Sequence, residues 1–351
     1  MRRSRLGPAG LLLLALAAAA AAGAWYVAGV LNAPAGPPGP PRVVEVTPGR
    51  PFAAVARDLE AAGVVRDGRL LAWYARLTGR ASRLKAGEYE FPADVTPRQV
   101  LARLVRGEIR QHKVTVPEGY TVREVAALLA AEGLAQEAAF VDRAQDAAFA
   151  RGLGVPADRL EGYLAPDTYR FVRGLSPGAI LEAMVAQYRA NVPPALLEEA
   201  ARQGFAEHQL VTLASIVEKE TGQADERPLV AAVFRNRLRR SMPLQSDPTV
   251  IYGMPEFHGN LRKVDLLRWS PYNTYRIRGL PPGPIANPGR AAIEAVVRPA
   301  PVDYLFFVSR NDGTHVFART LAEHERNVDR YQRRRPAPGA APRRAGAPRR
   351  R

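Results

Sequence analysis

The segment VEVTPGRPFAAVARDLEAAG at residues 44–63 occurs again, in altered form, as VTVPEGYTVREVAALLAAEG at residues 114–133. Alternating valines at the start of each copy predict a short β-strand. After a turn containing Pro and Gly, apolar residues spaced one, three and four apart predict a helix with one buried face. A glycine at the end of each copy, Gly63 or Gly133, is typical of the residue that follows a helix. One strand–turn–helix unit is therefore used twice.

The similarity between the two copies resumes further along, at an offset of 80 residues. The paired positions there are Tyr89/Tyr169, Phe91/Phe171, Thr96/Ser176, Pro97/Pro177, Leu101/Leu181 and Leu104/Met184. They predict an aromatic strand followed by a helix that Ser or Thr caps and Pro begins. Each copy is thus strand–helix–helix–strand–helix. The second copy has an insertion around Leu160–Tyr163, which is either a neutral loop extension or a functional loop bearing a carboxyl group and an aromatic ring.

The N-terminal end of the chain resembles a membrane anchor. Leu11–Leu31 is almost wholly apolar over 21 residues, about the length of helix that crosses a bilayer core. Arginines precede it and aromatic residues lie near its far end, which predicts a cytoplasmic N-terminus. We expect a cytoplasmic tail at 1–9, an anchor at 10–31, a Pro/Gly-rich linker at 32–42 and an extracytoplasmic remainder. A cleaved signal peptide is the alternative, because Ala-x-Ala sites occur within the apolar run.

The positive charge of the chain is concentrated at its two ends. The formal net charge is +16, but residues 1–42 and 333–351 carry twelve Arg and no acid, leaving 38 basic and 34 acidic residues in 43–332. The central part is nearly balanced, which argues against a nucleic-acid-binding face. We expect 333–351 to be a disordered Arg-rich tail, either solvated or attracted to anionic wall polymer or lipid. The absence of cysteine excludes disulfides and thiol catalysis.

A helix predicted over residues 208–221 carries the first candidate catalytic groups. Its sequence, HQLVTLASIVEKET, places most of its apolar residues on one face. Glu218 and Glu220 fall on the two shoulders of that face, whereas Lys219 points away from it. A carboxyl group half-buried among apolar side chains has a raised pKa, which suits a general acid. Helical geometry does not choose between the two glutamates, and an ordinary surface glutamate is the simpler interpretation of either.

Loops beyond residue 240 are rich in Tyr, Asn, Gln and Asp beside prolines. The two richest are QSDP at 245–248 and SPYNTY at 270–275. Aromatic rings stack on sugar faces and amides bind hydroxyl and N-acetyl groups, so these loops indicate either a sugar site or plain turn punctuation. A β-hairpin is predicted at 303–317, with a closing helix over 321–331. No third ligand stands at usable spacing from His315 and His324, so we expect no metal, and no motif indicates a cofactor.

Six blocks of sequence, in order, resemble the YceG-like family, the endolytic murein transglycosylases. The blocks are LEGYL with PDTY at 160–169, ASIVEKET at 214–221, QSDPT at 245–249, SPYNTY at 270–275, the Gly/Pro-rich run at 279–289, and GTHVF at 313–317 with Thr320, Glu323 and His324. The resemblance covers about residues 43–332. It departs at Ala165, where a bulky apolar residue is expected, and the basic tail lies outside it.

The resemblance implies an α+β fold: an N-terminal transmembrane helix, a small LysM-like module at 43–108 and a mixed α+β catalytic domain at 109–332. The family's catalytic glutamate corresponds to Glu218. The implied enzyme is a lyase that cleaves the MurNAc–GlcNAc bond of nascent peptidoglycan strands, leaves 1,6-anhydro-MurNAc ends and terminates strand elongation without a cofactor or metal. The residues that we assign to substrate binding are Glu161, Gln245, Asp247, Tyr272, Asn273 and Tyr275.

The implied location is the cell membrane, with a single pass, peptidoglycan strands as substrate, and peptidoglycan synthases or division proteins as candidate partners. A competing function is a non-catalytic, membrane-anchored wall-binding scaffold, which the repeat and the basic tail would also serve. A cytoplasmic small-molecule lyase is a third possibility. The predicted anchor orientation and the lack of a Gly-rich phosphate loop oppose that third function.

Overall fold

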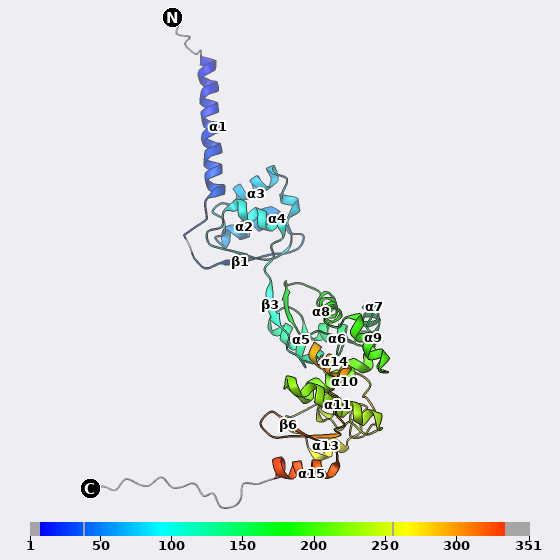
Figure 1. Ribbon diagram of the computed structural model, residues 1–351. Helices are drawn as coiled ribbons and strands as arrows, with labels where there is room; N and C mark the ends of the chain where they lie inside the picture. Colours follow the sequence, from blue (N-terminus) through cyan, green and yellow to red (C-terminus); the bar gives the residue numbers. More distant parts are fainter. Residues whose placement is uncertain (1–7, 38, 255, 334–351) are drawn as a thin grey trace, which may run out of the picture. The chain divides into compact units, whose positions relative to one another are not determined.

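The computed structural model describes residues 8–37, 39–254 and 256–333, and the chain divides into two compact units (Figure 1). The first unit comprises residues 1–113 and 170–175, and the second comprises residues 114–169 and 176–351. The predicted tail at 333–351 lies, beyond Arg333, outside the described residues. The chain therefore passes from one unit to the other three times rather than once.

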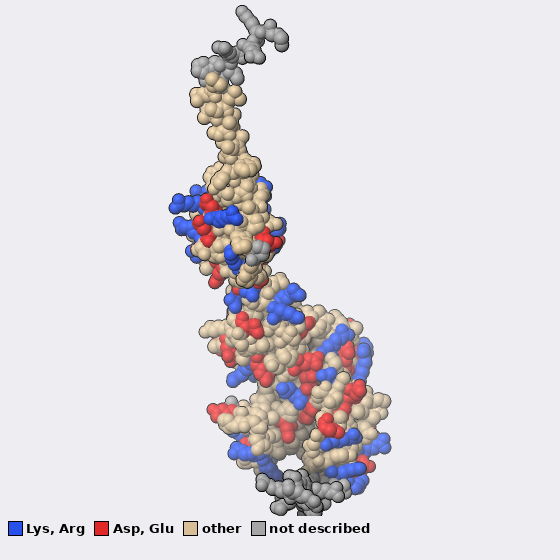
Figure 2. Space-filling view, turned by 90° about the vertical axis from the view of Figure 1, so that its left-hand side faces the viewer, with Lys and Arg blue, Asp and Glu red and all other residues tan. Residues whose placement is uncertain are grey.

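The N-terminal apolar segment forms helix α1 (Pro8–Asn32). Within it, Leu11–Asn32 is long and apolar enough to cross a membrane, and it is the one such helix among the described residues. Figure 2 shows no charged side chain along its length. The helix agrees in position with the predicted anchor at 10–31, and a signal sequence near the N-terminus would meet the same criteria.

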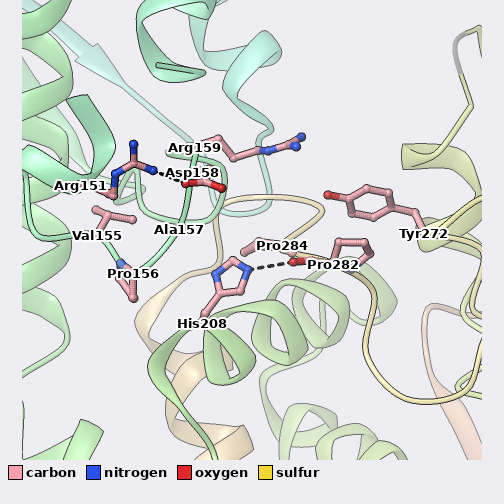
Figure 3. Close-up of a pocket in the computed structure, with 11 residues that line it drawn as sticks. Arg151, Val155, Pro156, Ala157, Asp158, Arg159, His208, Tyr272, Pro282 and Pro284 are labelled. Carbon is pink, nitrogen blue, oxygen red and sulfur yellow. Dashed lines mark hydrogen bonds and ion pairs between the residues drawn. The ribbon is translucent and has the colours of Figure 1, made fainter. Parts of the chain in front are cut away.

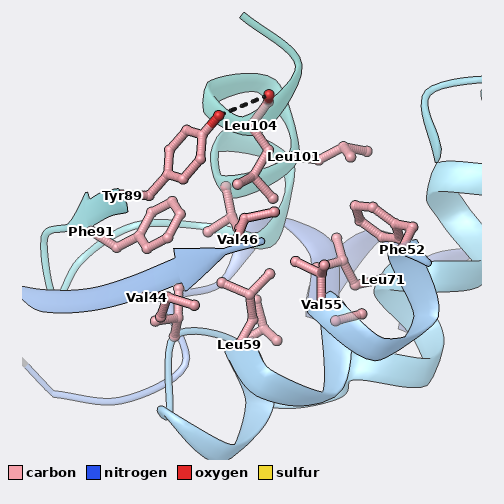
Figure 4. Close-up of a cluster of buried hydrophobic side chains, with 14 of the residues drawn as sticks. Val44, Val46, Phe52, Val55, Leu59, Leu71, Tyr89, Phe91, Leu101 and Leu104 are labelled. Atoms are coloured by element: carbon pink, nitrogen blue, oxygen red, sulfur yellow. Dashed lines mark hydrogen bonds between the residues drawn. The ribbon is translucent and has the colours of Figure 1, made fainter. Parts of the chain in front are cut away.

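Besides α1, the described part of the first unit contains a two-stranded sheet and three α-helices. Strands β1 (Arg42–Val46) and β2 (Gly87–Phe91) pair antiparallel, with Val44 opposite Tyr89. The helices are α2 (Phe52–Ala61), α3 (Gly68–Leu77) and α4 (Pro97–Arg106), with a 3₁₀ turn, η1, at Ala81–Arg83. Their apolar faces meet in one buried cluster around Val46, Leu59 and Leu101 (Figure 4). The predicted strand–helix–helix–strand–helix order is confirmed, while the similarity of this unit to a LysM module remains a prediction.

The second copy of the repeat follows the same order and gains one helix. Strand β3 (His112–Thr115) pairs with β4 (Thr168–Phe171). The helices are α5 (Val122–Ala131), α6 (Glu137–Ala144), α7 (Ala147–Gly152) and α8 (Pro177–Asn191). Gly63 and Gly133 both adopt positive φ, +68° and +66°, directly after the first helix of their copies, as predicted. Thr96 and Ser176 both cap the last helix of their copies with their side-chain hydroxyls.

The rest of the second unit is mainly helical and ends in a hairpin. Its elements are α9 (Pro194–Arg202), α10 (Glu207–Glu220), η2 (Ala224–Glu226), α11 (Arg227–Arg239), α12 (Asp247–Tyr252), α13 (Lys263–Leu267), α14 (Arg290–Val297), β5 (Phe306–Ser309), β6 (His315–Ala318), α15 (Leu321–Val328) and η3 (Asp329–Arg333). Helix α10 packs against α9, α11, α12 and α14. The predicted hairpin is confirmed, although its first strand begins at Phe306 rather than at residue 303.

Helix α10 is buried more completely than its amphipathic pattern predicts. Every residue from Leu210 to Val217 is buried, including Thr212 and Ser215. The two hydroxyls are tolerated because each donates to a carbonyl of its own helix, Thr212 to His208 and Ser215 to Thr212, both at 2.7 Å. Glu218 and Glu220 lie at the end of this buried helix, one turn or less beyond its core segment.

Candidate functional site

Glu218 lies near the C-terminal end of α10 with its side chain 5% exposed. Arg227 Nη2 donates to its Oε1 at 3.2 Å, and the backbone N–H of Gly289 donates to its Oε2 at 2.9 Å. The same Arg227 nitrogen lies 3.1 Å from Oε2 of Glu118. One guanidinium group therefore bridges two carboxyl groups, and only Glu118, at 46% exposed, is open to water.

The surroundings of Glu218 act on its pKa in opposite directions. Burial raises the pKa and so does the nearby Glu118 carboxylate, while the Gly289 N–H and the Arg227 guanidinium lower it. The net pKa is above the ordinary value for a glutamate. Such a carboxyl group binds a proton more readily than one in water, and it also has donors that stabilise it once the proton is gone.

Glu220 lies two residues further along, on a different side of α10. Ser246 donates a hydrogen bond from Oγ to its Oε1. Burial raises the pKa of Glu220 to about 7, and Asp247 contributes to the rise while Ser246 and Arg237 oppose it. Glu220 lines a cavity of about 430 Å³ together with Gln245, Asp247 and Tyr275. Three of the predicted substrate-binding residues thus gather around the glutamate that helical geometry left as an alternative to Glu218.

Glu161, from the predicted insertion, lines a different cavity, of about 620 Å³. Its Oε1 accepts the backbone N–H of Val122 at 3.0 Å, and its Oε2 accepts the Tyr252 hydroxyl at 3.1 Å. Asn287 Nδ2 lies 3.4 Å from Oε1. Burial raises the pKa of Glu161 to about 7, since these partners carry no positive charge. The insertion therefore places a buried acid in a cavity wall.

Tyr272 and Arg159 line the cavity of Glu161 and a neighbouring one of about 500 Å³. Figure 3 shows the Arg159 guanidinium and the Tyr272 hydroxyl directed toward one another in the second of these cavities. His208 lies in its wall, where it bonds the carbonyl of Pro282 through Nε2 at 3.0 Å. An aromatic ring beside a cationic group suits a ligand with a flat apolar face and polar or anionic substituents.

Asn273 is buried and holds its own loop. Its Nδ2 donates to the carbonyls of Leu266 and Arg268, and its Oδ1 accepts the backbone N–H of Tyr275 at 2.9 Å. These bonds fix the turn that directs Tyr272 and Tyr275 toward different cavities. The structure thus gives Asn273 a supporting part, and a direct contact with substrate stays a prediction.

The predicted site residues form three groups rather than one. Glu161 and Tyr272 share one cavity, Gln245, Asp247 and Tyr275 share another with Glu220, and Glu218 lines neither of these two within the described part of the chain. The two candidate metal ligands have other partners: His315 Nδ1 lies 2.7 Å from Glu226, and His324 stacks on Phe306. In the residues that the structure describes, no three His, Asp or Glu side chains converge as a metal site.

Sequence reasoning missed two arginines that organise these groups. Arg227 binds Glu218, and Arg237 lines the cavity of Glu220. Arg237 had a detectable signal, because it follows Val230, Val233 and Phe234 at the spacing of one helix face and so falls on the buried side of α11. Arg227 had none, since its contacts are with residues distant in sequence or on another helix.

Comparisons with known proteins agree with the fold. The family model described as the YceG-like family matches residues 44–330. The endolytic murein transglycosylase of Bacillus subtilis (strain 168) is 32% identical over 304 residues, which cover 82% of this chain and 84% of that protein. The endolytic murein transglycosylase of Streptococcus pneumoniae serotype 2 (strain D39 / NCTC 7466) is 31% identical over 307 residues, 78% of this chain and 55% of that protein.

A solved structure of a YceG-like protein is also similar to this chain. The crystal structure of a YceG-like protein from Listeria monocytogenes matches with a TM-score of 0.58 and 32% identity, over 82% of this chain and 99% of that one. Fold and cavities together define an α+β protein with an apolar N-terminal helix and buried acids beside polar, aromatic cavities. The chain belongs to the YceG-like family.

Proposed function

We propose that this protein is an endolytic peptidoglycan lytic transglycosylase, an enzyme of the lyase class that cuts within glycan strands. The observation that carries the proposal is the buried Glu218 carboxyl group, whose pKa is raised and which stands where the resemblance to the family places the catalytic glutamate. The names of the relatives, which match over most of this chain, support the same activity.

In the proposed reaction Glu218 is first the acid and then the base. The protonated carboxyl group gives its proton to the oxygen between MurNAc and GlcNAc as the bond from that oxygen to C1 of MurNAc breaks. The C6 hydroxyl of the same MurNAc then attacks C1 and loses its proton to Glu218. The bond from C1 to O6 replaces the broken one, so the product is a 1,6-anhydro-MurNAc end and no water is consumed.

A single carboxyl group is enough because the nucleophile is already part of the substrate. Two-carboxylate glycosidases need a second group to attack or to activate water. An intramolecular hydroxyl can instead recover roughly 7–11 kcal/mol of the barrier through proximity alone. The Arg227 guanidinium and the Gly289 N–H stabilise the carboxylate that Glu218 becomes between the two steps.

The two cavities supply the proposed binding of the strand. Tyr272 beside Glu161, and Tyr275 beside Gln245 and Asp247, offer aromatic faces and hydrogen-bonding groups that suit sugars. In a single-pass membrane protein with a cytoplasmic N-terminus, these cavities would meet strands as they are made. The enzyme would then end strand elongation, and peptidoglycan synthases would be its natural neighbours.

The test is digestion of purified glycan strands by the full chain in detergent, followed by mass spectrometry of the new ends. We expect ends lighter than reducing MurNAc by one water. Glu218→Gln should fold normally and lose roughly 10²–10⁴ in rate, the usual cost of removing a general acid–base. Glu182→Gln, an exposed glutamate on α8, is the matched control and should keep the wild-type rate.

Three outcomes would contradict parts of the proposal. Reducing ends would indicate a hydrolase that uses a second carboxyl group. Full activity of Glu218→Gln would transfer the role of acid to Glu220 or Glu161. Tight binding of strands without any new ends, by the wild type under all conditions, would favour the non-catalytic scaffold.

A further inference from the structure

We propose that Glu220 is a specificity-determining residue that donates a hydrogen bond to an acceptor oxygen of an N-acetylated sugar, in the cavity that it shares with Gln245, Asp247 and Tyr275. The inference rests on the proposed function and identifies how one part of the site would hold the strand. Glu220 keeps its proton in this role, in contrast to Glu218, which transfers its proton.

Among the described residues, one oxygen of the Glu220 carboxyl group is hydrogen-bonded to the protein and the other is not. Ser246 donates to Oε1, and Ser246 is itself held by its backbone N–H, which donates to Thr274 Oγ1 at 3.0 Å. In the part of the chain that the structure describes, Oε2 forms no hydrogen bond with a protein group. Since Glu220 lines the cavity, this oxygen is available to a ligand.

Arg237, the cation that acts on Glu220, makes its hydrogen bonds elsewhere. Arg237 donates from Nε to the carbonyl of Leu305 and from Nη1 to the carbonyl of Leu244, both at 2.7 Å. Within the described residues it forms no ion pair with Glu220. The other acid of the cavity, Asp247, has its own donor, because the Tyr275 hydroxyl bonds Oδ1 at 2.6 Å. Each acid of the cavity therefore has one hydroxyl donor from the protein, Ser246 for Glu220 and Tyr275 for Asp247.

The charge balance around Glu220 supports a neutral carboxyl group. The groups that line the cavity or act on Glu220 from the surrounding elements are Arg237 on α11, Gln245, Ser246 and Asp247 at the start of α12, Tyr275 on its loop, His315 on β6 and His324 on α15. His315 is occupied by Glu226, and burial lowers the pKa of His324, which favours its neutral form. With the pKa of Glu220 at about 7, a large share of the molecules carry the proton at neutral pH.

Gln245 adds an independent sign of function. Its φ of +51° is in the left-handed region, which is costly for a residue other than glycine. The backbone N–H of Gln245 donates to the carbonyl of Thr274 at 3.1 Å, so the loop holding Tyr275 fixes this conformation. The side chain is exposed and lines the cavity of Glu220. Strain at such a position is typical of a residue kept in place for a ligand.

The cavity thus presents a hydrogen-bond donor from Glu220, an acceptor from Asp247, an amide from Gln245 and an aromatic ring from Tyr275. A sugar bearing an acetamido group needs this set: a donor for its carbonyl, acceptors for its N–H and hydroxyls, and a ring against its apolar face. An ionised Glu220 would lose the donor and place a second negative charge beside Asp247. Binding should therefore weaken as pH rises through the pKa of Glu220.

The experiment measures binding of glycan strands by the full chain in detergent from pH 5.5 to 8.5, in the Glu218→Gln background so that strands are not consumed. The variants are Glu220→Gln, which keeps a donor and an acceptor for Ser246, and Glu220→Ala, which keeps neither. We expect the Kd of the parent, which carries Glu218→Gln alone, to rise roughly tenfold above pH 7. The Kd of the Glu220→Gln variant should not change with pH. The Kd of the Glu220→Ala variant should be roughly tenfold to hundredfold higher than that of the parent at every pH.

Turnover in the otherwise wild-type chain separates this role from catalysis. Glu220→Gln should leave kcat within a few fold, whereas Glu220→Ala should raise KM more than it lowers kcat. The inference is overturned if Glu220→Gln keeps the pH dependence of its parent, or if it loses kcat as severely as Glu218→Gln does. A wild type that binds strands without cutting them refutes the proposed function alone, because the binding comparison needs no cleavage. Thermal unfolding of each variant confirms that it is folded.

Discussion

Glu88 in the first unit and Glu161 in the second are both 6% exposed, yet their surroundings differ in kind. Glu88 lies on β2, where His112 Nε2 is 2.6 Å and Arg110 Nη1 is 3.2 Å from its carboxyl oxygens. Arg173 is 3.7 Å away. Glu161 lies in the inserted loop, and among the described residues its donors are a backbone N–H, a hydroxyl and an amide.

Although the two glutamates are equally exposed to solvent, their pKa values are shifted in opposite directions. Burial raises the pKa of both groups, but at Glu88 the hydrogen bond and charge of His112, with Arg173 and Arg110, outweigh it, and the pKa is below its usual range. At Glu161 burial outweighs the hydrogen bonds of Val122 and Tyr252 and the charge of Arg159, and the pKa is about 7. The charged partners beside a carboxyl group, together with how deeply the surrounding protein encloses it, decide whether it is a structural anion or a neutral acid. Both glutamates lie in copies of the same strand–helix–helix–strand–helix repeat.

The largest expected effect tests whether the two copies form separate cores. Leu59 and Leu129 are equivalent in the repeat and fully buried. Each substitution to alanine should cost about 2–5 kcal/mol of unfolding free energy, the usual range for a buried leucine. Denaturant unfolding of the full chain in detergent should show that each variant shifts a different transition. If Leu59→Ala moved both transitions equally, the two units would be one cooperative body.

A second prediction is that the stabilities of the two units respond to pH in opposite directions. Glu161 has a raised pKa, so its native state holds the proton that the unfolded chain releases, and stability falls as pH rises from about 4.5 to about 7. The loss from this group is on the order of 3 kcal/mol at most. Glu220 adds a loss of the same sign in the same window.

Glu161→Gln should therefore flatten part of the pH dependence of the second unit, which denaturant unfolding at pH 5 and pH 8 measures. Glutamine can accept the Val122 N–H with its amide oxygen and donate to the Tyr252 hydroxyl oxygen with its amide nitrogen. For the first unit the sign reverses, since the lowered pKa of Glu88 gives stability that is present above pH 4.5 and lost as pH falls through the folded-state pKa. Equal pH profiles of the two units would remove the contrast between these glutamates.

A smaller effect is expected from neutralising Glu88. Glu88→Gln should destabilise the first unit by roughly 1–3 kcal/mol at pH 7, because His112 and the two arginines lose their shared anion. The matched control is Glu90→Gln, an exposed glutamate paired with Arg110 at 2.9 Å, which should cost about 1 kcal/mol or less. Indistinguishable losses from the two variants would show that burial adds nothing to the Glu88 cluster.

The smallest prediction concerns a bond that both copies share. The Tyr89 hydroxyl donates to the carbonyl of Lys85 at 2.8 Å, and the Tyr169 hydroxyl donates to that of Ala165 at 2.6 Å. Substitution of either tyrosine by phenylalanine should cost about 0.5–1.5 kcal/mol. Thermal unfolding should give similar losses for the two variants. A loss in one copy alone would mean that the copies kept the ring but not the use of its hydroxyl.

The features that could be predicted from the sequence depend on interactions between residues that are close together in the chain. The order of elements, the caps at Thr96 and Ser176, and the glycines after the first helices depend on residues close together in the chain, and each is confirmed. Loops 245–249 and 270–275 have no periodicity, so nothing in their sequence shows that Tyr272 and Tyr275 line different cavities. The bond from Arg227 to Glu118 joins residues 109 positions apart and had no signal to find it.

The return of residues 170–175 to the first unit limits how this protein can be rearranged. A domain that is exchanged between genes by recombination is encoded by one uninterrupted stretch of sequence with two ends. Here a donor that replaced residues 43–108 would also have to match six residues encoded beyond the inserted segment. The two units are therefore expected to be inherited together, and a truncation that removes the first would leave part of it behind.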